Sequence, residues 1–233
     1  MGGSALGKTL NNIQRLDHVF TDERLLAQAL THRSFGAPHY ERLEFLGDGI
    51  LNLIAADLLF KAHPHAPEGD LSRLRSRLVR DTTLAEIAND LGISDHVRLG
   101  LGEKKSGGFL RASILADVVE ALIGAVYLDG GFLEAHRVVA SLLDERLKNL
   151  PPAETLKDAK TRLQEWRQAQ GLSLPSYRII EEKGADHEKE FLVECALDED
   201  QLATQARAAS RRKAEQMAAS AMLSQLGVKH DNA

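Results

Sequence analysis

A change in the spacing of apolar residues near residue 150 most constrains how this 233-residue chain can fold. Before that point, apolar side chains recur at intervals of three and four residues, which is typical of amphipathic helices. After the segment LPPA, a strand-like alternation appears in FLVECAL at residues 191–197. The chain therefore predicts an all-α domain over residues 10–148, a linker at 149–156 and a small mixed domain over 157–228.

Turn signals such as Asp129-Gly130-Gly131 divide both domains into short elements. The second domain is expected to be an α+β module in which a helix, three strands and a helix follow one another. The predicted helices of the first domain are residues 22–31, 41–60, 70–91, 112–128 and 132–148. The predicted elements of the second are a helix at 157–170, strands at 177–181, 191–197 and 201–206, and a helix at 210–226.

Composition excludes several classes of protein. The longest uncharged apolar run, residues 121–128, is far short of the roughly 20 residues that a membrane span needs. Because Cys195 is the single cysteine, no internal disulfide can form, and we expect a protein of the reducing cytoplasm. The net charge of −5, taken alone, disfavours a nucleic-acid-binding protein.

Two of the predicted helices carry several carboxylates on one face. Glu41, Glu44 and Asp48 follow the spacing i, i+3 and i+7 among apolar neighbours, which predicts partial burial. In the nearly apolar helix at 112–128, the only charged residues are Asp117 and Glu120, again three apart. Buried carboxylates take up a proton unless a cation lies opposite them.

Two interpretations of these acids compete. In the first, Arg33, Arg42 or Arg111 neutralises them in buried ion pairs. In the second, the two helices converge on a divalent cation, and ligands that are all oxygen favour Mg²⁺ or Mn²⁺ over zinc. Gly47 and Gly49 would then leave room for a bulky ligand. Because the pattern occurs on both helices, the sequence favours a metal site, and the usual chemistry of such sites is phosphoryl transfer.

Long motifs carry a resemblance to the ribonuclease III family over about residues 10–228. The run ERLEFLGDGIL at 41–51 is similar to the signature of that family, and SILADVVEALIGAVYLDGG at 113–131 resembles its second acidic motif. The segment APEGDLSRL at 66–74 also fits. The resemblance implies a homodimeric, Mg²⁺-dependent endonuclease for double-stranded RNA, with Mn²⁺ as a substitute ion. Its products would carry 5′-phosphate and 3′-hydroxyl ends.

The resemblance also assigns roles to the acidic residues. Four of them would bind the metal, and Asp48 and Glu120 among them would also be catalytic. Glu41 and Glu68 would lie beside the cleft and shape it or touch the substrate. The four expected metal ligands are Glu44, Asp48, Asp117 and Glu120.

Three further features bear on the function. Phe45 resembles the residue that inserts into the partner subunit, and a core position is the equally open alternative. None of the nine histidines forms a pair suited to metal-free acid–base cleavage, and we expect His32 to be structural. The loop at 103–108 fails the phosphate-loop pattern, so no nucleotide cofactor is expected.

The second predicted domain resembles the double-stranded RNA-binding domain. The resemblance places three residues of the first helix against minor-groove 2′-hydroxyl groups, and His187 in the next minor groove. The start of the last helix would contact phosphates. The expected helix contacts are Thr161, Gln164 and Glu165 in the first helix, and Ser210, Arg211, Arg212 and Lys213 in the last.

Two departures from the usual pattern of this domain suggest modest affinity for RNA outside the dimer. Ala206 and Ala208 stand where the family usually has glycines. Glu215 occupies a position that is basic in many stand-alone members.

The sequence thus predicts a double-strand-specific endoribonuclease that processes precursors of rRNA and mRNA. The alternative is an RNA-binding regulator with an inactive nuclease fold, which the complete set of four acids disfavours. A metal phosphohydrolase for small nucleotides is a third possibility, and the appended RNA-binding domain argues against it.

Overall fold

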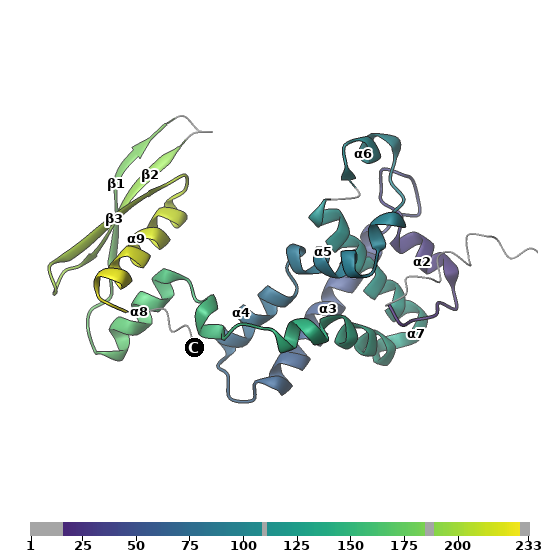
Figure 1. Ribbon diagram of the computed structural model, residues 1–233, viewed down its shortest axis with the longest axis horizontal. Coiled ribbons are helices and arrows are strands. Elements are labelled where there is room, and N and C mark those ends of the chain that lie inside the picture. The colour runs from purple at the N-terminus through teal and green to yellow at the C-terminus, as the bar shows by residue number, and fades with distance from the viewer. Residues whose placement is uncertain (1–15, 109–110, 185–188, 229–233) are drawn as a thin grey trace, which may run out of the picture. The chain divides into compact units, whose positions relative to one another are not determined.

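The computed structural model describes residues 16–108, 111–184 and 189–228, and the chain divides into two compact units between Leu150 and Pro151 (Figure 1). The first unit is helical. The second combines two helices with a three-stranded sheet. The predicted fold class is therefore confirmed. The predicted first domain begins at residue 10, which lies outside the described residues.

The first unit differs from the predicted helices in two places. The predicted helix at 70–91 is wrong, because an extended Arg80 (φ −72°, ψ 153°) separates two helices there. The predicted helices at 112–128 and 132–148 run together, with a kink at Gly131 where φ is 77°. The helices are α2 Glu23–Ala29, α3 Glu41–Ala62, α4 Glu68–Leu78, α5 Asp81–Asp90, α6 Leu101–Lys105 and α7 Ala112–Lys148. Within the described residues, no helix is long and apolar enough to cross a membrane.

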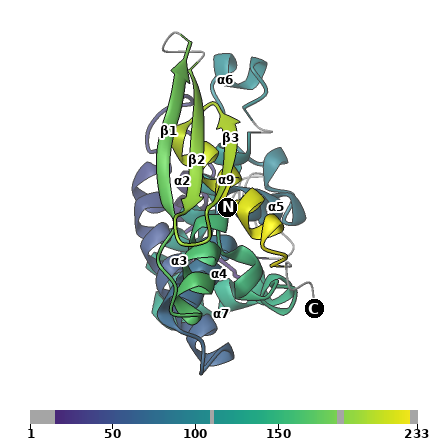
Figure 2. The ribbon, with the colours of Figure 1, turned by 90° about the vertical axis from the view of Figure 1, so that its left-hand side faces the viewer.

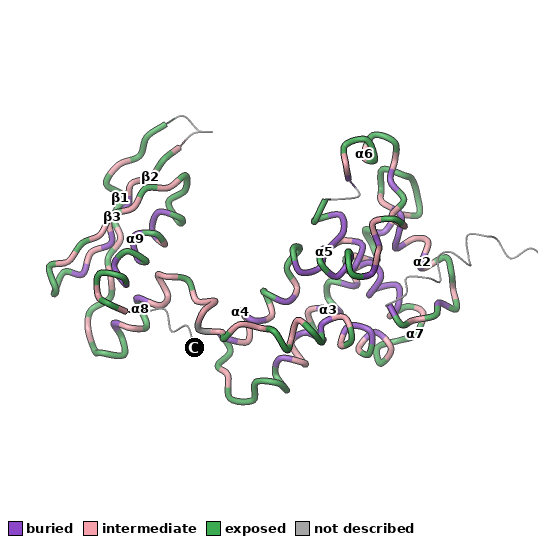
Figure 3. The backbone as a smooth tube through the Cα atoms, in the orientation of Figure 1, coloured by how far each residue is buried: buried purple, intermediate pink, exposed green. Residues whose placement is uncertain are grey.

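The core of the first unit lies where α3, α5 and α7 meet (Figure 3). Leu51 and Ile54 of α3 pack there with Leu122 and Ile123 of α7, and all four are buried. Burying a side chain of this size stabilises the fold by roughly 1.5–3 kcal/mol. The hydrophobic effect therefore holds the two acidic helices against each other.

Two glycines allow the backbones of α3 and α7 to touch. A Cβ atom on Gly47 would lie 1.7 Å from the carbonyl oxygen of Glu120, and one on Gly124 would lie 2.3 Å from that of Leu43. The expectation that Gly47 leaves room for a ligand is therefore wrong, since helix α7 fills that space. Gly49 differs, because nothing lies within 4 Å of the position its Cβ would take.

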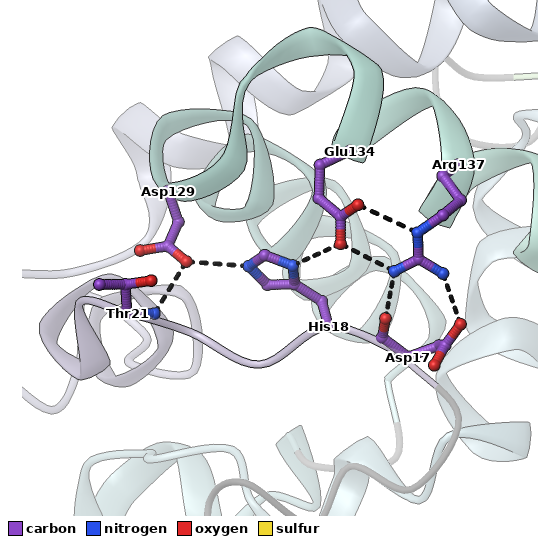
Figure 4. A network of polar contacts seen from close by, with 6 residues as sticks. All are labelled: Asp17, His18, Thr21, Asp129, Glu134 and Arg137. Atoms are coloured by element: carbon purple, nitrogen blue, oxygen red, sulfur yellow. Dashed lines mark hydrogen bonds and ion pairs between the residues drawn. The ribbon is translucent and has the colours of Figure 1, made fainter.

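His18 attaches the start of the described chain to α7 beside the kink (Figure 4). Its ring nitrogens lie 2.9 Å from Asp129 Oδ2 and 2.8 Å from Glu134 Oε1, and its side chain is only 7% exposed. Arg137 forms ion pairs with Glu134 and Asp17. Hydrogen bonds from Arg137, and then from His18, lower the pKa of Glu134 to about 2. This network fixes the direction in which the chain enters α2.

The second unit is an antiparallel sheet in the order β1-β2-β3 with helices packed on one face (Figure 2). Val193, Cys195 and Leu197 of the middle strand point into the core, and Leu163 and Met222 of the helices meet them there. The register between the first two strands shifts after residue 179. The elements are α8 Ala159–Ala169, β1 Ser176–Lys183, β2 Glu190–Leu197, β3 Leu202–Ala208 and α9 Arg211–Gln225.

One buried charge belongs to the structure of this unit. The side chain of Arg167 is 1% exposed, and its Nε donates a hydrogen bond to the carbonyl oxygen of Ser173 at 2.9 Å. Ion pairs with Asp200 and with Glu199 (3.4 Å) neutralise it. Because each polar group has a partner, Arg167 joins α8 to the β2–β3 turn without leaving a buried charge uncompensated.

The helix crossing can be tested with a matched pair of glycine substitutions. Gly47→Ala places a methyl group against backbone, and we expect it to lower the free energy of unfolding by about 1–3 kcal/mol or more. Gly49→Ala lies in the same helix with open space around it, so we expect no loss and a gain of up to about 1 kcal/mol. Urea denaturation followed by circular dichroism measures both. Equal effects of the two substitutions would contradict close packing at Gly47.

Candidate active site

The helix crossing brings three carboxylates together. Glu44 lies one turn before Gly47 on α3, and Asp117 and Glu120 lie on the facing part of α7. One carboxylate oxygen from each lies within 4.8 Å of those from the other two. All three residues are half-buried. Three of the four predicted metal ligands thus converge, although they come from segments far apart in the sequence.

Burial and mutual repulsion make this cluster a poor place for three negative charges. Burial, followed by the nearby carboxylates of Asp48, Asp117 and Glu44, raises the pKa of Glu120 to about 8. Burial is also the main cause of the raised pKa of Glu44 and of Asp117. The folded protein therefore holds acidic groups whose charges nothing in the cluster offsets.

Of the three arginines expected to neutralise the cluster, two have other partners, and the third, Arg42, is exposed. Arg33 forms its ion pair with Glu41 at 3.3 Å, and Arg111 forms one with Glu103 at 2.6 Å. Across the described ranges, no lysine or arginine forms an ion pair with Glu44, Asp117 or Glu120. The interpretation of these acids as buried ion pairs is therefore wrong.

The donor set of the cluster fits a hard divalent cation. It offers carboxylate oxygens at mutual distances that a single ion can span, and neither cysteine nor histidine belongs to it. Such oxygen ligands suit Mg²⁺ or Mn²⁺. A divalent cation would also remove the repulsion that raises the pKa of Glu120.

The fourth predicted ligand, Asp48, lies outside the group of three. Its side chain is exposed at the edge of the cluster, where Nδ2 of Asn52 donates a hydrogen bond to its Oδ1 at 2.7 Å. Its charge nevertheless raises the pKa of both Glu44 and Glu120. Asp48 therefore contributes to the negative charge around the cluster without belonging to the group of three.

The two residues expected beside the cleft lie in different surroundings. Glu41 is exposed at the start of α3 and pairs with Arg33, and it lines the same cavity as Glu44. Glu68 begins α4, accepts a hydrogen bond from Ser72 at 2.6 Å and lines a groove between α3 and α4. Within one copy of the chain, Glu68 thus does not join the acidic cluster.

A cavity of about 620 Å³ opens next to the cluster and is lined by charges of both signs. Glu44 and Asp117 line it, as do Arg33 and Arg111, each of which is paired with another acid of the lining. His32 also lines it, and burial lowers the pKa of its ring. The His32 ring is hydrogen-bonded to Ser34 at 2.7 Å, as expected for a structural histidine.

Tyr40 is a site residue that the sequence motifs did not reveal. It is 2% exposed, and its hydroxyl donates a hydrogen bond to Asp117 Oδ2 at 3.1 Å. Burial and the nearby carboxylates, Asp117 first, raise its pKa, so the hydroxyl stays a donor. The only signal in the sequence was that Tyr40 directly precedes the acidic run that begins at Glu41. This adjacency does not show which carboxylate the tyrosine hydroxyl contacts in the fold.

Phe45 projects from α3 into solvent and is 84% exposed, so the alternative of a core phenylalanine is wrong. Leu53 and Phe60 are exposed on the same helix. Both also line the groove between α3 and α4, which has a volume of about 470 Å³. One copy of the chain thus leaves a row of large apolar side chains uncovered.

The second unit carries the predicted RNA contacts that the structure describes along α8 and at the start of α9. Gln164 and Glu165 are exposed on α8, and Glu165 is paired with Lys157 at 2.6 Å. Ser210 caps α9 by accepting a hydrogen bond from the backbone of Lys213. His187 lies outside the described residues. The remaining predicted contacts are Thr161, half-buried on α8, and Arg211 and Arg212, exposed on α9.

Comparison with known proteins agrees with this geometry. A family model described as ribonuclease-III-like matches residues 22–147, and a double-stranded RNA binding motif matches residues 159–226. The chain belongs to the ribonuclease III family.

Curated relatives from bacteria match most of the chain. The protein named Ribonuclease 3 from Dechloromonas aromatica is 50% identical over 213 residues, which cover 91% of this chain and 96% of that protein. Ribonuclease 3 from Thiobacillus denitrificans is 54% identical over 206 residues, covering 88% and 91%. As a ribonuclease III family member with both domains, the protein is an endoribonuclease, which hydrolyses phosphodiester bonds of RNA.

A solved structure resembles the first unit. It is the nuclease domain of ribonuclease III from Campylobacter jejuni, with a TM-score of 0.56 and 41% identity. The match covers 58% of this chain and 95% of that domain, whose description names a region involved in dimer formation.

The role of Tyr40 in this ribonuclease III site can be tested through metal affinity. Tyr40→Phe removes the hydrogen bond that orients Asp117, and we expect Mn²⁺ to bind about 10–100-fold more weakly, as when outer-shell partners of metal ligands are lost. Isothermal titration calorimetry with Mn²⁺ measures this directly. Tyr127→Phe on α7, which removes a hydroxyl outside the cluster, is the control. Unchanged affinity in Tyr40→Phe would show that Asp117 is held without it.

Proposed function

We propose that this protein cleaves double-stranded RNA endonucleolytically with the help of Mg²⁺, leaving 5′-phosphate and 3′-hydroxyl ends. The observation that carries the proposal is the cluster of Glu44, Asp117 and Glu120, with which no lysine or arginine of the described residues forms an ion pair. The attached RNA-binding domain supports a duplex substrate. The complete acidic set also argues against an inactive RNA-binding regulator, which would have no need to keep these repelling groups.

The carboxylates of Glu44, Asp117 and Glu120, with Asp48 beside them, would hold the divalent cation. When bound, that ion supplies Lewis-acid chemistry: it offsets the charge that develops on the phosphate and favours ionisation of the attacking water. Tyr40 keeps Asp117 in place through its hydrogen bond.

The other residues of the cleft position the substrate and the water. Arg33 and Arg111, which line the same cavity, would supply positive charge for the phosphates of the strand to be cut. Asp48 and Glu120 are the carboxylates that we assign to the reaction itself. Asn52 holds the exposed Asp48 carboxylate at the edge of the cluster, where it can orient the water and accept its proton.

We propose structured precursors of rRNA and mRNA as the substrates, in the reducing cytoplasm. The family supports this class of substrate, because a duplex-specific nuclease needs long helical RNA. The compartment is supported by Cys195, which is a buried free thiol.

The nuclease proposal is tested by incubating duplex RNA, single-stranded RNA and duplex DNA with the protein in Mg²⁺ and in EDTA. We expect cutting of duplex RNA alone, and only with the metal. Glu120→Gln keeps the shape of the site but removes a charged ligand, so we expect cleavage to fall by about 100-fold or more while duplex binding persists.

Glu86→Gln, an exposed acid on α5, is the matched control and should cut like the wild type. Cleavage in EDTA, or undiminished cleavage by Glu120→Gln, would overturn the metal assignment. Equal cutting of single-stranded RNA would overturn the duplex substrate.

We also propose that two copies of the chain pair through the exposed side of α3. The row formed by Phe45, Leu53 and Phe60 is apolar and uncovered, and the groove beside the last two could receive a large side chain. Glu68 lines that groove. A second copy would therefore cover the apolar row. It would also bring its own surface to Glu68, which lies apart from the acidic cluster within a single copy.

Phe45→Ala tests the dimer. If Phe45 is an interface anchor, its truncation should weaken self-association by roughly 2 kcal/mol or more, which is about 30-fold in the dissociation constant. Analytical ultracentrifugation measures this. Leu133→Ala removes an equally exposed apolar residue of α7 and should have little effect. A Phe45→Ala variant that associates like the wild type would contradict this interface.

A further inference from the structure

Two polar contacts join the start of α8 to the first turns of α9, and a third, within α9, shares the same carboxylate. Glu215 is buried, with 8% of its surface exposed, and its two carboxylate oxygens receive hydrogen bonds from Lys160 Nζ at 2.6 Å and Arg211 Nε at 2.8 Å. The backbone N–H of Lys160 donates to Oε1 of Gln216 at 3.2 Å. Both helix starts are therefore attached to one another through two neighbouring residues of α9.

Lys160 extends this connection to the sheet. Its ammonium group lies 4.3 Å from the centre of the Tyr177 ring on β1, in the geometry of a cation–π contact. The Tyr177 side chain in turn packs against the core of this unit. One cation thus touches α9 and the sheet while its own backbone belongs to α8, so the three elements share a single point of contact.

Two cations neutralise the carboxylate of Glu215. Although burial by itself would raise the pKa of this carboxyl, hydrogen bonds from Lys160 and Arg211 lower it below the ordinary value. Glu215 stands where many stand-alone members of this domain carry a basic residue, and the modest RNA affinity expected from that departure stays a prediction. The structure adds that this acid is buried and paired with Lys160 and Arg211.

The two joined helix starts are the surfaces proposed to contact RNA. Thr161, Gln164 and Glu165 lie on α8, and the exposed cations Arg212 and Lys213 lie at the start of α9. In an A-form duplex, the minor-groove 2′-hydroxyl groups and the phosphates across the neighbouring major groove lie at a fixed separation, which differs in B-form DNA. A protein that reads both must hold its two contact surfaces at the matching separation.

We propose that Glu215 is a positioning residue that sets this separation and thereby the preference for duplex RNA over duplex DNA. It acts through Lys160, which fixes α8, and through Arg211, whose Nε donates a hydrogen bond to it. The inference rests on the RNA contacts proposed above and adds the residue that spaces them.

The test measures affinities of the full chain for RNA and DNA duplexes of one sequence by fluorescence anisotropy, in EDTA to prevent cleavage. Glu215→Gln keeps the side-chain shape but removes the charge that holds two cations. We expect its RNA affinity to fall roughly tenfold, within the range for residues coupled in one contact network, and its DNA affinity to stay within twofold. The RNA-to-DNA preference should therefore fall about tenfold.

Glu194→Gln is the matched control. Glu194 also has two side-chain partners, Arg178 at 2.7 Å and Gln205 at 3.0 Å, but it lies on the sheet face away from the helices. We expect it to change neither affinity. Lys160→Met is the second variant, because it leaves Glu215 paired with Arg211. It should reduce the preference as well, and the double variant should add little to either single one, since both remove the same connection.

Several outcomes would overturn the proposal. Parallel loss of RNA and DNA affinity would make Glu215 merely structural, and increased affinity for both would make it a repulsive charge. If neither Glu215→Gln nor Lys160→Met changes the preference for RNA over DNA, Glu215 does not set the separation of the two contact surfaces. Because two variants are tested, this conclusion holds even if one of them folds poorly. Arg211→Ala with Arg212→Ala separates this from failure of the proposed function, because that pair must weaken RNA binding whatever Glu215 does.

Discussion

The contact between the backbones of α3 and α7 is the constraint on which the rest of the nuclease unit depends. It exists because Gly47 and Gly124 lack a side chain, and it places Glu44 opposite Asp117 and Glu120. These carboxylates repel one another. Burial, and then the neighbouring carboxylates, raise the pKa of Glu120 from 4.5 to about 8, so the fold disfavours its ionised form. The apolar core between the helices therefore imposes an arrangement that the acids themselves resist.

Part of this arrangement could be predicted from the sequence. The spacing of Asp117 and Glu120 shows that they share a helix face, and alternation shows which residues of β2 point inward. The meeting of the two acidic helices could not be derived in this way, because it depends on a close approach between distant glycines. Local geometry also decided the partners of Arg33, which lies nearer to Glu41 than to the cluster. Periodicity likewise failed at Arg80, where the apolar repeat continues although the backbone turns.

The two faces of α3 show that an apolar sequence pattern does not reveal whether a helix face is buried within the same unit or left for a partner. Leu51 and Ile54 are buried in the core of the same unit, whereas Phe45, Leu53 and Phe60 are exposed. Both sets recur at helical spacing, so the sequence indicates only that the helix is apolar nearly all round, which predicts burial on both sides. One copy of the chain buries one side. The other side is left for a partner, and in the proposed dimer a second copy would supply a surface that matches by symmetry.

The net charge of −5 misleads for the same reason, since it counts charges without their partners. Glu215 contributes to that sum, yet its charge is held between Lys160 and Arg211 and does not face the solvent. The acids of the nuclease cluster contribute as well, and there the excess negative charge is what favours a divalent cation. What an RNA duplex would meet is the exposed Arg212 and Lys213 at the start of α9. The same kind of residue therefore has two different roles: the unpaired carboxylates form the proposed metal site, and the paired Glu215 holds the cations around it in place.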